Sequence, residues 1–503
     1  MTATGDNRTG KVDPVAVVAP YVTNPDRDVF ALRGLPEEVV AVLFAYYSRS
    51  PTDLRTALAR MLEAEGEVVG AAPVPVLAGA QEKAEAFHEK WVVGYGHNSV
   101  AEHATVHLAV ERCSILAAKV LEDARIGVAF TEKSTRFVVF DEAALVTDVG
   151  WPAAEAAIYE AAARDLLRAY ASLVARAEAV LVEKWPGVPR QALRAHACDL
   201  CRGLLPAGVP TNVGITANAR ALAHRISLLR ASPLDEVRRI GEAMLAEASL
   251  VVPTLLRHAE PDGSRDEAAR RVRALVAGRL IPPREPRMDE GWIKLPGREV
   301  PGAYAILREI TARPADRLAQ AIVEEVYGAR WQACSGALGQ GPEPVIDAYL
   351  GARGPHDAPG RALESVGYLF EVVGDYGIWR DLARHRLLSS QPPVLGCDLG
   401  YRIPDDLEAL GLGGEARAAL DGVVAAWRRL SAVHPLRAQY VVPLAYRVRW
   451  MLDANLREIF HVIELRSRRG GHENYRRLAW QFADQVIDGL PAVRKHLRVD
   501  RNS

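Results

Sequence analysis

Two arginines and a histidine stand together at Arg384, His385 and Arg386, within a stretch that reads as a partly apolar helix. Cationic side chains this close repel one another unless an anion lies among them. The triplet therefore predicts a site for an anionic ligand. No polar segment follows that would grip such a ligand, because the chain runs into Gln391 and two prolines.

A second pattern occurs in both halves of the chain. Each half carries a proline, an asparagine, an arginine, a histidine and a glutamate in the same order: Pro206, Asn218, Arg220, His224 and Glu236, then Pro443, Asn455, Arg457, His461 and Glu473. In both halves twelve residues separate the proline from the asparagine, and eighteen separate the asparagine from the glutamate. A polar helix face with ordinary caps explains a single copy. Repetition at fixed spacing indicates an internal duplication that produced two homologous lobes.

The elements that must position these residues are mostly helices. Alanine-rich or amphipathic patterns predict helices over residues 152–185, 191–206, 415–431 and 473–490. Alternating or β-branched stretches predict strands over residues 104–110, 134–140 and 366–373. Residues 258–302 are charged and rich in proline, which is typical of a linker. We expect a tail at 1–32, a first lobe at 33–258, a linker at 259–302 and a second lobe at 303–498.

Composition sets limits on the function. The chain has 503 residues, 49% apolar and 25% charged, with a net charge of −1, as in an ordinary globular protein. No global positive charge attracts nucleic acid or an anionic membrane. The polar N-terminus has no apolar core and no run is long enough to span a bilayer, so we expect a cytoplasmic protein with no membrane partner.

The five cysteines and one histidine pair raise the question of metal binding. Cys198 and Cys201 form the only CxxC, without two further ligands at matching spacing, and are interpreted as core residues of a helix. His97 and His103, with Glu102 between them, are six residues apart, which does not place both histidines on one helical face. We therefore expect no metal.

These motifs resemble those of the flavin-dependent thymidylate synthases, over residues 95–253 and 358–490. The family's pattern comprises Gly-His-x-x-x-x-Glu-His, Arg-His-Arg, Glu-x-Ser-x-Arg, Arg-x-x-Leu-Pro and an Asn-x-Arg helix that ends in an arginine. The first half carries Gly96 to His103, Glu132 to Arg136, Arg202 and Asn218, but not the triplet, and Leu229 stands in place of the helix-end arginine. The second half keeps the triplet, Asn455 and Arg466, but lacks Glu-x-Ser-x-Arg and has Gln439 in place of Arg202.

The two halves have thus lost opposite motifs. In the family, the triplet and the helix-end arginine come from one subunit, while the Glu-x-Ser-x-Arg and Arg-x-x-Leu-Pro arginines come from a neighbour. The resemblance therefore implies one complete composite site for each pair of first and second lobes. Whether that site forms within one chain or between chains is open at this point.

The resemblance also implies residue roles. A dUMP site would comprise Glu132, Ser134, Thr135, Arg136, Arg202, Arg384 and Arg466, with Arg384 and Arg466 as the catalytic residues. An FAD site would comprise His97, Ser99, Glu102, Asn218, Arg220, His224, Arg384, His385, Arg386, Asn455, Arg457 and His461. Surrounding cations should keep His385 neutral.

The implied reaction transfers a one-carbon unit from methylenetetrahydrofolate to C5 of dUMP, with hydride from reduced FAD and NADPH as reductant. Arg466 would face the pyrimidine and favour its deprotonated form, which requires no thiol. The implied fold is α+β, with two lobes of helices and a mostly antiparallel sheet, and a homodimer of four lobes.

Three alternatives compete with this reading. One is a flavin enzyme that transfers a methyl or hydroxymethyl group to another pyrimidine nucleotide, and another is a non-catalytic nucleotide-binding paralogue. The third is nucleic-acid binding through Arg466, Arg468 and Arg469, although cations and glycines at such a position commonly close a helix C-terminus.

Overall fold

The computed structural model describes residues 17–47, 52–63, 82, 84–86, 98–124, 126–257, 259–276, 302–328, 330–332, 341–469 and 472–501. Its contacts divide the chain into two compact units. The first unit comprises residues 1–111, 126–132 and 212–275, and the second comprises 112–125, 133–211 and 276–503. The second unit thus combines segments from both halves of the sequence.

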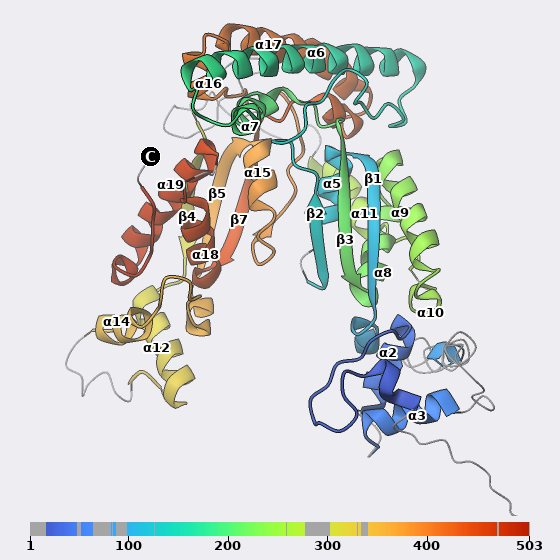
Figure 1. Ribbon diagram of the computed structural model, residues 1–503. Helices are drawn as coiled ribbons and strands as arrows, with labels where there is room; N and C mark the ends of the chain where they lie inside the picture. Colours follow the sequence, from blue (N-terminus) through green and yellow to red (C-terminus); the bar gives the residue numbers. More distant parts are fainter. Residues whose placement is uncertain are drawn as a thin grey trace, which may run out of the picture. The chain divides into compact units, whose positions relative to one another are not determined.

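The first unit contains a three-stranded sheet in the order β1-β3-β2 (Figure 1). Strands β2 and β3 are antiparallel, with Val128 opposite Ala217. The elements of this part of the chain are η1 (Ala19–Tyr21), α2 (Glu37–Tyr47), α3 (Leu54–Glu63), η3 (Asn98–Glu102), β1 (Thr105–Ser114), β2 (Val128–Glu132), β3 (Pro210–Asn218), α8 (Ala219–Arg230), α9 (Asp235–Ala248), α10 (Pro253–Leu256) and α11 (Ser264–Val276).

The second unit contains a four-stranded antiparallel sheet in the order β4-β5-β7-β6. Its core lies where this sheet meets α19, and the rings of Phe370 and Phe482 pack there at 4.8 Å. Its elements are α5 (Ile115–Glu122), α6 (Ala153–Lys184), α7 (Arg190–Cys201), η4 (Arg202–Leu204), β4 (Tyr304–Ile310), α12 (Pro314–Tyr327), α14 (Glu343–Gly351), η5 (Arg361–Ser365), β5 (Gly367–Asp375), α15 (Tyr376–Leu382), β6 (Ser389–Ser390), α16 (Asp405–Ala409), α17 (Gly413–Val433), η6 (Arg437–Val441), β7 (Arg447–Asn455), α18 (Leu456–Arg466), α19 (Glu473–Gly489) and η7 (Pro491–Val493).

The duplication is visible in the topology. The order β1-β3-β2 in one sheet matches β5-β7-β6 in the other, and β4 adds an edge strand to the second. The central strand of each sheet ends at an asparagine that caps the next helix. Asn218 Oδ1 accepts a hydrogen bond from Ala221 N, and Asn455 Oδ1 accepts one from Glu458 N. The predicted α+β fold with two homologous lobes is confirmed.

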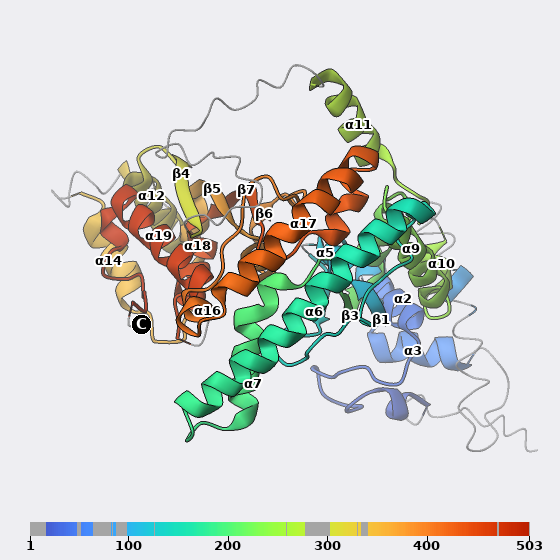
Figure 2. The same ribbon diagram turned by 90° about the horizontal axis from the view of Figure 1, so that it is seen from above.

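Within the second unit, segments of the two halves meet through matching bonds. Helices α6 and α17 lie side by side (Figures 1 and 2). Beyond them, Ala207 N donates to Val442 O and Leu444 N donates to Leu205 O, both at 3.0 Å. The two bonds are equivalent. Pro206 of the first half corresponds to Pro443 of the second, the two prolines form a β-bridge, and the residues before and after each proline make the same bond in both directions. This junction places Arg202, at the start of η4, in the second unit.

Most of the predicted helices are confirmed, and one strand prediction is wrong. Residues 134–140 form no strand, while β2 lies just before them at Val128–Glu132. Ser134 Oγ instead accepts a hydrogen bond from Arg136 N at 3.2 Å, a local bond that competes with sheet pairing. Phe140 is buried against Tyr170, so its apolar character reflects core packing.

The segment interpreted as a linker contains a helix, α11, at Ser264–Val276. Residues 277–301 lie outside the described part of the chain. The lobe boundaries given above stay a prediction.

Candidate functional site

The arginine-histidine-arginine triplet follows α15, a helix that Asp375 fixes at its start. Asp375 Oδ1 accepts a hydrogen bond from Ile378 N at 2.9 Å, and Oδ2 accepts one from Asn474 Nδ2 at 3.0 Å. The second bond ties the start of α15 to the start of α19. After the helix, His385 is buried, whereas Arg384 and Arg386 are exposed.

Arg466, the last residue of α18, is bonded to the triplet segment. Its Nε donates to His385 Nε2 at 2.9 Å, and its Nη2 donates to the backbone oxygen of Asp381 at 2.6 Å. An imidazole nitrogen accepts only when it carries no proton, so the proton of His385 lies on Nδ1, 3.3 Å from Glu458 Oε1. Two acceptors thus fix the guanidinium of Arg466.

The pKa of His385 agrees with this arrangement. Burial lowers that pKa, and the charge of Arg466 lowers it further, against the hydrogen bond to Glu458. The prediction that His385 is neutral is therefore confirmed. Its main cause is burial, and repulsion by neighbouring cations is secondary.

Arg136 and Arg202 come from the first half of the sequence but lie in the second unit. Arg136 Nε is 3.0 Å and Arg202 Nε is 3.2 Å from Asp199 Oδ1. Arg202 Nη2 is 3.5 Å from Asp381 Oδ2, and Arg384 Nη2 is 3.9 Å from Asp381 Oδ1. These contacts connect arginines of both halves in one cluster, which we call the arginine cluster: Arg136, Arg202, Arg384 and Arg466.

A histidine that the sequence analysis missed lies beside this cluster. His472 caps α19, and its Nδ1 accepts a hydrogen bond from Asn474 N at 3.3 Å. Burial lowers the pKa of His472 to about 4, and the charge of Arg202 acts in the same direction. This imidazole therefore adds no positive charge near neutral pH.

The low pKa of His472 predicts a pH dependence of stability. The unfolded histidine titrates near 6.5, so between pH 6.5 and about 4 the unfolded chain binds a proton that the folded chain does not. This contribution is fully present above pH 6.5 and is lost as the pH falls. The His472→Asn variant keeps a capping side chain. Between about pH 7 and 5, we expect its free energy of unfolding to fall by on the order of 1 kcal/mol less than that of the wild type.

Urea unfolding of the wild type and the variant at both pH values measures this difference. An equal loss in the two proteins would show that His472 is not the titrating group.

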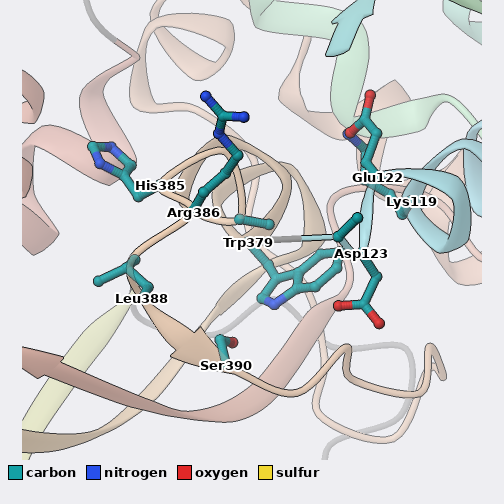
Figure 3. A pocket seen from close by; sticks show the side chains of 10 residues that line it. Lys119, Glu122, Asp123, Trp379, His385, Arg386, Leu388 and Ser390 are labelled. Atoms are coloured by element: carbon teal, nitrogen blue, oxygen red, sulfur yellow. The ribbon is translucent and has the colours of Figure 1, made fainter. Parts of the chain in front are cut away.

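A pocket includes His385 in its lining (Figure 3). It is lined by Lys119, Glu122, Asp123, Ala124, Trp379, Ala383, His385, Arg386, Leu388 and Ser390. Two buried polar atoms in this lining, Trp379 Nε1 and Ser390 Oγ, have no hydrogen-bond partner among the described residues. Figure 3 shows the indole nitrogen turned toward the side where Ser390 lies. His385 thus belongs to the lining of this pocket and is also bonded to Arg466 of the arginine cluster.

Several predicted site residues belong to the first unit instead. They are Ser99, Glu102, Glu132, Asn218, Arg220 and His224. Within that unit Arg220 Nη1 is 2.6 Å from Glu102 Oε1, both side chains being about half exposed. Gly127 packs against Asn218, where a Cβ would meet the Asn218 amide at 2.5 Å. His97 lies outside the described residues.

The remaining predicted site residues of the second unit each make a different contact. Asn455 caps α18, and Arg457 Nη1 is 3.0 Å from Glu364 Oε1. The His461 ring contacts the His385 ring at a centroid distance of 5.2 Å. Thr135 is buried beside the turn made by Ser134. Their roles stay predictions.

Gln439, which corresponds to Arg202 in the second half, is hydrogen-bonded within the protein at both ends of its amide. Gln439 Oε1 accepts a hydrogen bond from Leu395 N at 3.0 Å, and its Nε2 donates to Leu436 O at 2.9 Å. Both polar ends of the side chain are therefore used within the fold. This position offers no cation for a second phosphate.

The cysteine interpretation is confirmed for the CxxC pair. Cys198 and Cys201 are buried in α7, and burial raises the pKa of Cys201 to about 12. Among the described residues, which exclude His97, no group of three His, Cys, Asp or Glu side chains is arranged to hold a metal ion. In the same part of the chain, no helix is long and apolar enough to cross a membrane.

Comparison with known proteins gives a family match. The model of the family described as "Thymidylate synthase complementing protein" matches residues 43–254 and 347–492. The two matched segments are consistent with a tandem duplication.

Relatives match over different lengths. A "UPF0159 protein" of Chlamydia muridarum is 33% identical over 95% of this chain and 93% of its own length. A "Flavin-dependent thymidylate synthase" of a Mycobacterium species (strain KMS) is 31% identical over 33% of this chain and 66% of its own length. The solved structure of the flavin-dependent thymidylate synthase ThyX from Helicobacter pylori, complexed with FAD and dUMP, aligns with 39% of this chain and 98% of that chain, at 19% identity and a TM-score of 0.30.

Proposed function

Because the chain belongs to the thymidylate synthase complementing protein family, we propose that it is a flavin-dependent thymidylate synthase-like enzyme. It transfers a one-carbon unit from methylenetetrahydrofolate to C5 of dUMP, with hydride from reduced FAD. The observation that carries this proposal is the arginine cluster, in which arginines of both halves lie within one unit of one chain.

The phosphate of dUMP binds to Arg136 and Arg202. These guanidinium groups share the Asp199 carboxylate, which orients both of them before a ligand arrives. Arginine forks bind phosphate oxygens in two-point contacts, which supports a doubly charged monophosphate as the ligand.

Arg466 acts on the pyrimidine. His385 Nε2 and the Asp381 backbone oxygen hold its guanidinium, so its remaining N–H groups have fixed directions. A fixed cation beside the ring favours the deprotonated base and raises electron density at C5. No cysteine is needed, which agrees with the burial of Cys198, Cys201 and Cys397, because burial raises the pKa of each of these thiols.

We assign the flavin ring to the pocket that includes His385 in its lining. Among the described residues, Trp379 Nε1 and Ser390 Oγ are buried without hydrogen-bond partners, and a heteroaromatic ring rich in acceptors would offer partners to both donors. Arg386 lines the same pocket and supplies positive charge to an anionic group. FAD, when bound, supplies the hydride, and the names of the mycobacterial relatives support this cofactor.

His385 supports adjacent sites for nucleotide and flavin, since it belongs to the lining of the pocket and its Nε2 accepts a hydrogen bond from Arg466. We test the proposal by the visible absorption spectrum of the purified protein, before and after anaerobic NADPH, with and without dUMP. A flavin spectrum that bleaches with NADPH and shifts on adding dUMP is expected. A protein that takes up no added FAD would contradict the proposal.

The bonded side chain of Gln439 predicts the number of dUMP molecules that bind to each chain. We expect calorimetric titration of the FAD-loaded protein to give one dUMP per chain, because Gln439 replaces the arginine in the second copy and its side chain is bonded within the fold. Two dUMP per chain would mean that both lobes bind nucleotide independently. We further expect two chains to assemble as a four-lobe homodimer.

A further inference from the structure

Glu458, in the first turn of α18, carries a buried carboxylate whose partner is an imidazole. Its Oε1 lies 3.3 Å from Nδ1 of His385, which is also buried. Among the described residues, no other side chain bonds to this carboxylate. A neutral imidazole compensates a buried carboxylate less well than a cation does. Stability alone therefore does not account for a glutamate at this position.

His385 connects two residues of one helix. Its Nε2 accepts a hydrogen bond from Arg466 Nε at 2.9 Å, while its Nδ1 faces Glu458. Glu458 and Arg466 are eight residues apart in α18, which corresponds to about 12 Å along the helix axis. The cap by Asn455 fixes the turn that carries Glu458. The imidazole is thus held at both nitrogens by groups on one helix.

The order of donor and acceptor in this arrangement selects one tautomer of His385. A carboxylate only accepts hydrogen bonds, and a guanidinium only donates them. With the proton on Nδ1, both contacts of the ring are hydrogen bonds. With the proton on Nε2, two donors would face each other at Arg466 and two acceptors at Glu458. Loss of Glu458 would remove one of these two constraints.

The first half of the chain has lost all three members of this arrangement. Counted from the caps of the corresponding helices, three apolar residues stand at the matching positions: Ala221 for Glu458, Ala124 for His385 and Leu229 for Arg466. A carboxylate would lose its partner once the histidine was replaced, and the histidine would lose its acceptor role without the arginine. Joint replacement therefore supports a single functional unit.

We propose that Glu458 is a positioning residue, which keeps the proton of His385 on Nδ1 and thereby fixes the direction of the Arg466 guanidinium. Glu458 acts through His385 and need not touch a ligand. Its effect on turnover rests on the proposed function, in which Arg466 acts on the pyrimidine. Its effect on the imidazole does not depend on that function.

The tautomer of His385 is measured by ¹⁵N NMR of the full chain labelled at histidine, above neutral pH, because protonated and unprotonated ring nitrogens differ in chemical shift. The signals of His385 are assigned by their absence from His385→Gln. Glu458→Met fills the same space without an acceptor, whereas Glu458→Gln keeps an acceptor in its amide oxygen. Glu464→Gln is the matched control, because Glu464 lies in the same helix and pairs with Arg353.

We expect the proton on Nδ1 in the wild type, in Glu458→Gln and in Glu464→Gln. In Glu458→Met, the ratio of the Nδ1–H form to the Nε2–H form should fall by at least about tenfold, as for loss of a hydrogen bond to a charged group, so that the second form becomes detectable.

The effect on turnover is measured as dTMP formation at saturating dUMP. Glu458→Met should lower kcat by about tenfold and leave the dissociation constant of dUMP within about threefold of the wild type. In the Arg466→Leu background the same change should have no further effect on kcat, because Glu458 acts through that arginine.

A proton on Nε2 in the wild type, or an unchanged tautomer in Glu458→Met, overturns the inference. A changed tautomer with unchanged kcat also overturns it, because Arg466 would then not depend on His385. If Glu458→Met does not fold, Glu458→Ala, which introduces the residue type of the first half, takes its place. Absence of dTMP formation by the wild type contradicts the proposed function instead, and the ring signals still decide on Glu458.

Discussion

Replacement of Arg466 by leucine, the residue at the matching position of the first half, is expected to lower kcat by about 100- to 1,000-fold. The variant removes the charge that acts on the pyrimidine but leaves Arg136 and Arg202, so dUMP binding should weaken much less than turnover. We measure dTMP formation by mass spectrometry at saturating dUMP, together with the dissociation constant of dUMP.

Arg468→Leu is the matched control for this prediction. Arg468 follows the same helix, is exposed, and bonds through Nε to the Glu464 backbone oxygen. Its loss should leave kcat unchanged. If Arg466→Leu retained wild-type turnover, Arg466 would have no part in the chemistry, and electrostatic activation of the base by this residue would be wrong.

Replacement of Arg202 by glutamine, the residue at the matching position of the second half, is expected to raise the dissociation constant of dUMP by about 100-fold. The Arg202 side chain is only 13% exposed and lies beside two carboxylates. Removing one partner of such a buried charge set costs about 2–5 kcal/mol. Without the Arg202 guanidinium, the negative charges of Asp199 and Asp381 should repel the phosphate of dUMP.

A nucleoside separates phosphate binding from other effects. Deoxyuridine carries no phosphate, so its affinity should change little between the wild type and Arg202→Gln. Arg417→Gln, which breaks a surface pair with Glu408, serves as the control for loss of an arginine. Equal weakening of dUMP and deoxyuridine would assign Arg202 a general structural role.

Local sequence patterns predicted the elements well where one pattern dominated. The alanine-rich run produced α6, and the repeated asparagines mark the starts of α8 and α18 because each side chain caps its own helix. The strand prediction for residues 134–140 was wrong, since apolar and β-branched residues also occur in turns that pack against a core. The short strand β2 carried no comparable signal.

The partners of the arginines were not predictable from local sequence. Asp199 precedes Arg202 by three residues, a spacing that is common for ion pairs on a helix surface. Asp381 meets Arg202, and His472 meets the cluster, only because η4 and η6 join the halves through matching backbone bonds. Such contacts depend on tertiary structure.

The backbone bonds between residues 205–207 and 442–444 bear on whether the composite site forms within one chain or between chains. The arginines of the first half reach the triplet within one unit of one chain, so a neighbouring chain is not required to complete the arginine cluster. This arrangement is the basis for expecting one nucleotide site per chain.

The central claim is tested most directly by mixing Arg136→Ala with Arg466→Ala, after forced subunit exchange, and recording the flavin spectral shift that dUMP induces and dTMP formation. Each variant alone is expected to be defective, and the mixture should remain defective, because every chain lacks part of its own site. Recovery of the dUMP-induced shift and of activity to about a quarter of the wild-type level would show that the site is shared between chains, because half of the dimers would be mixed and each would hold one intact site of two.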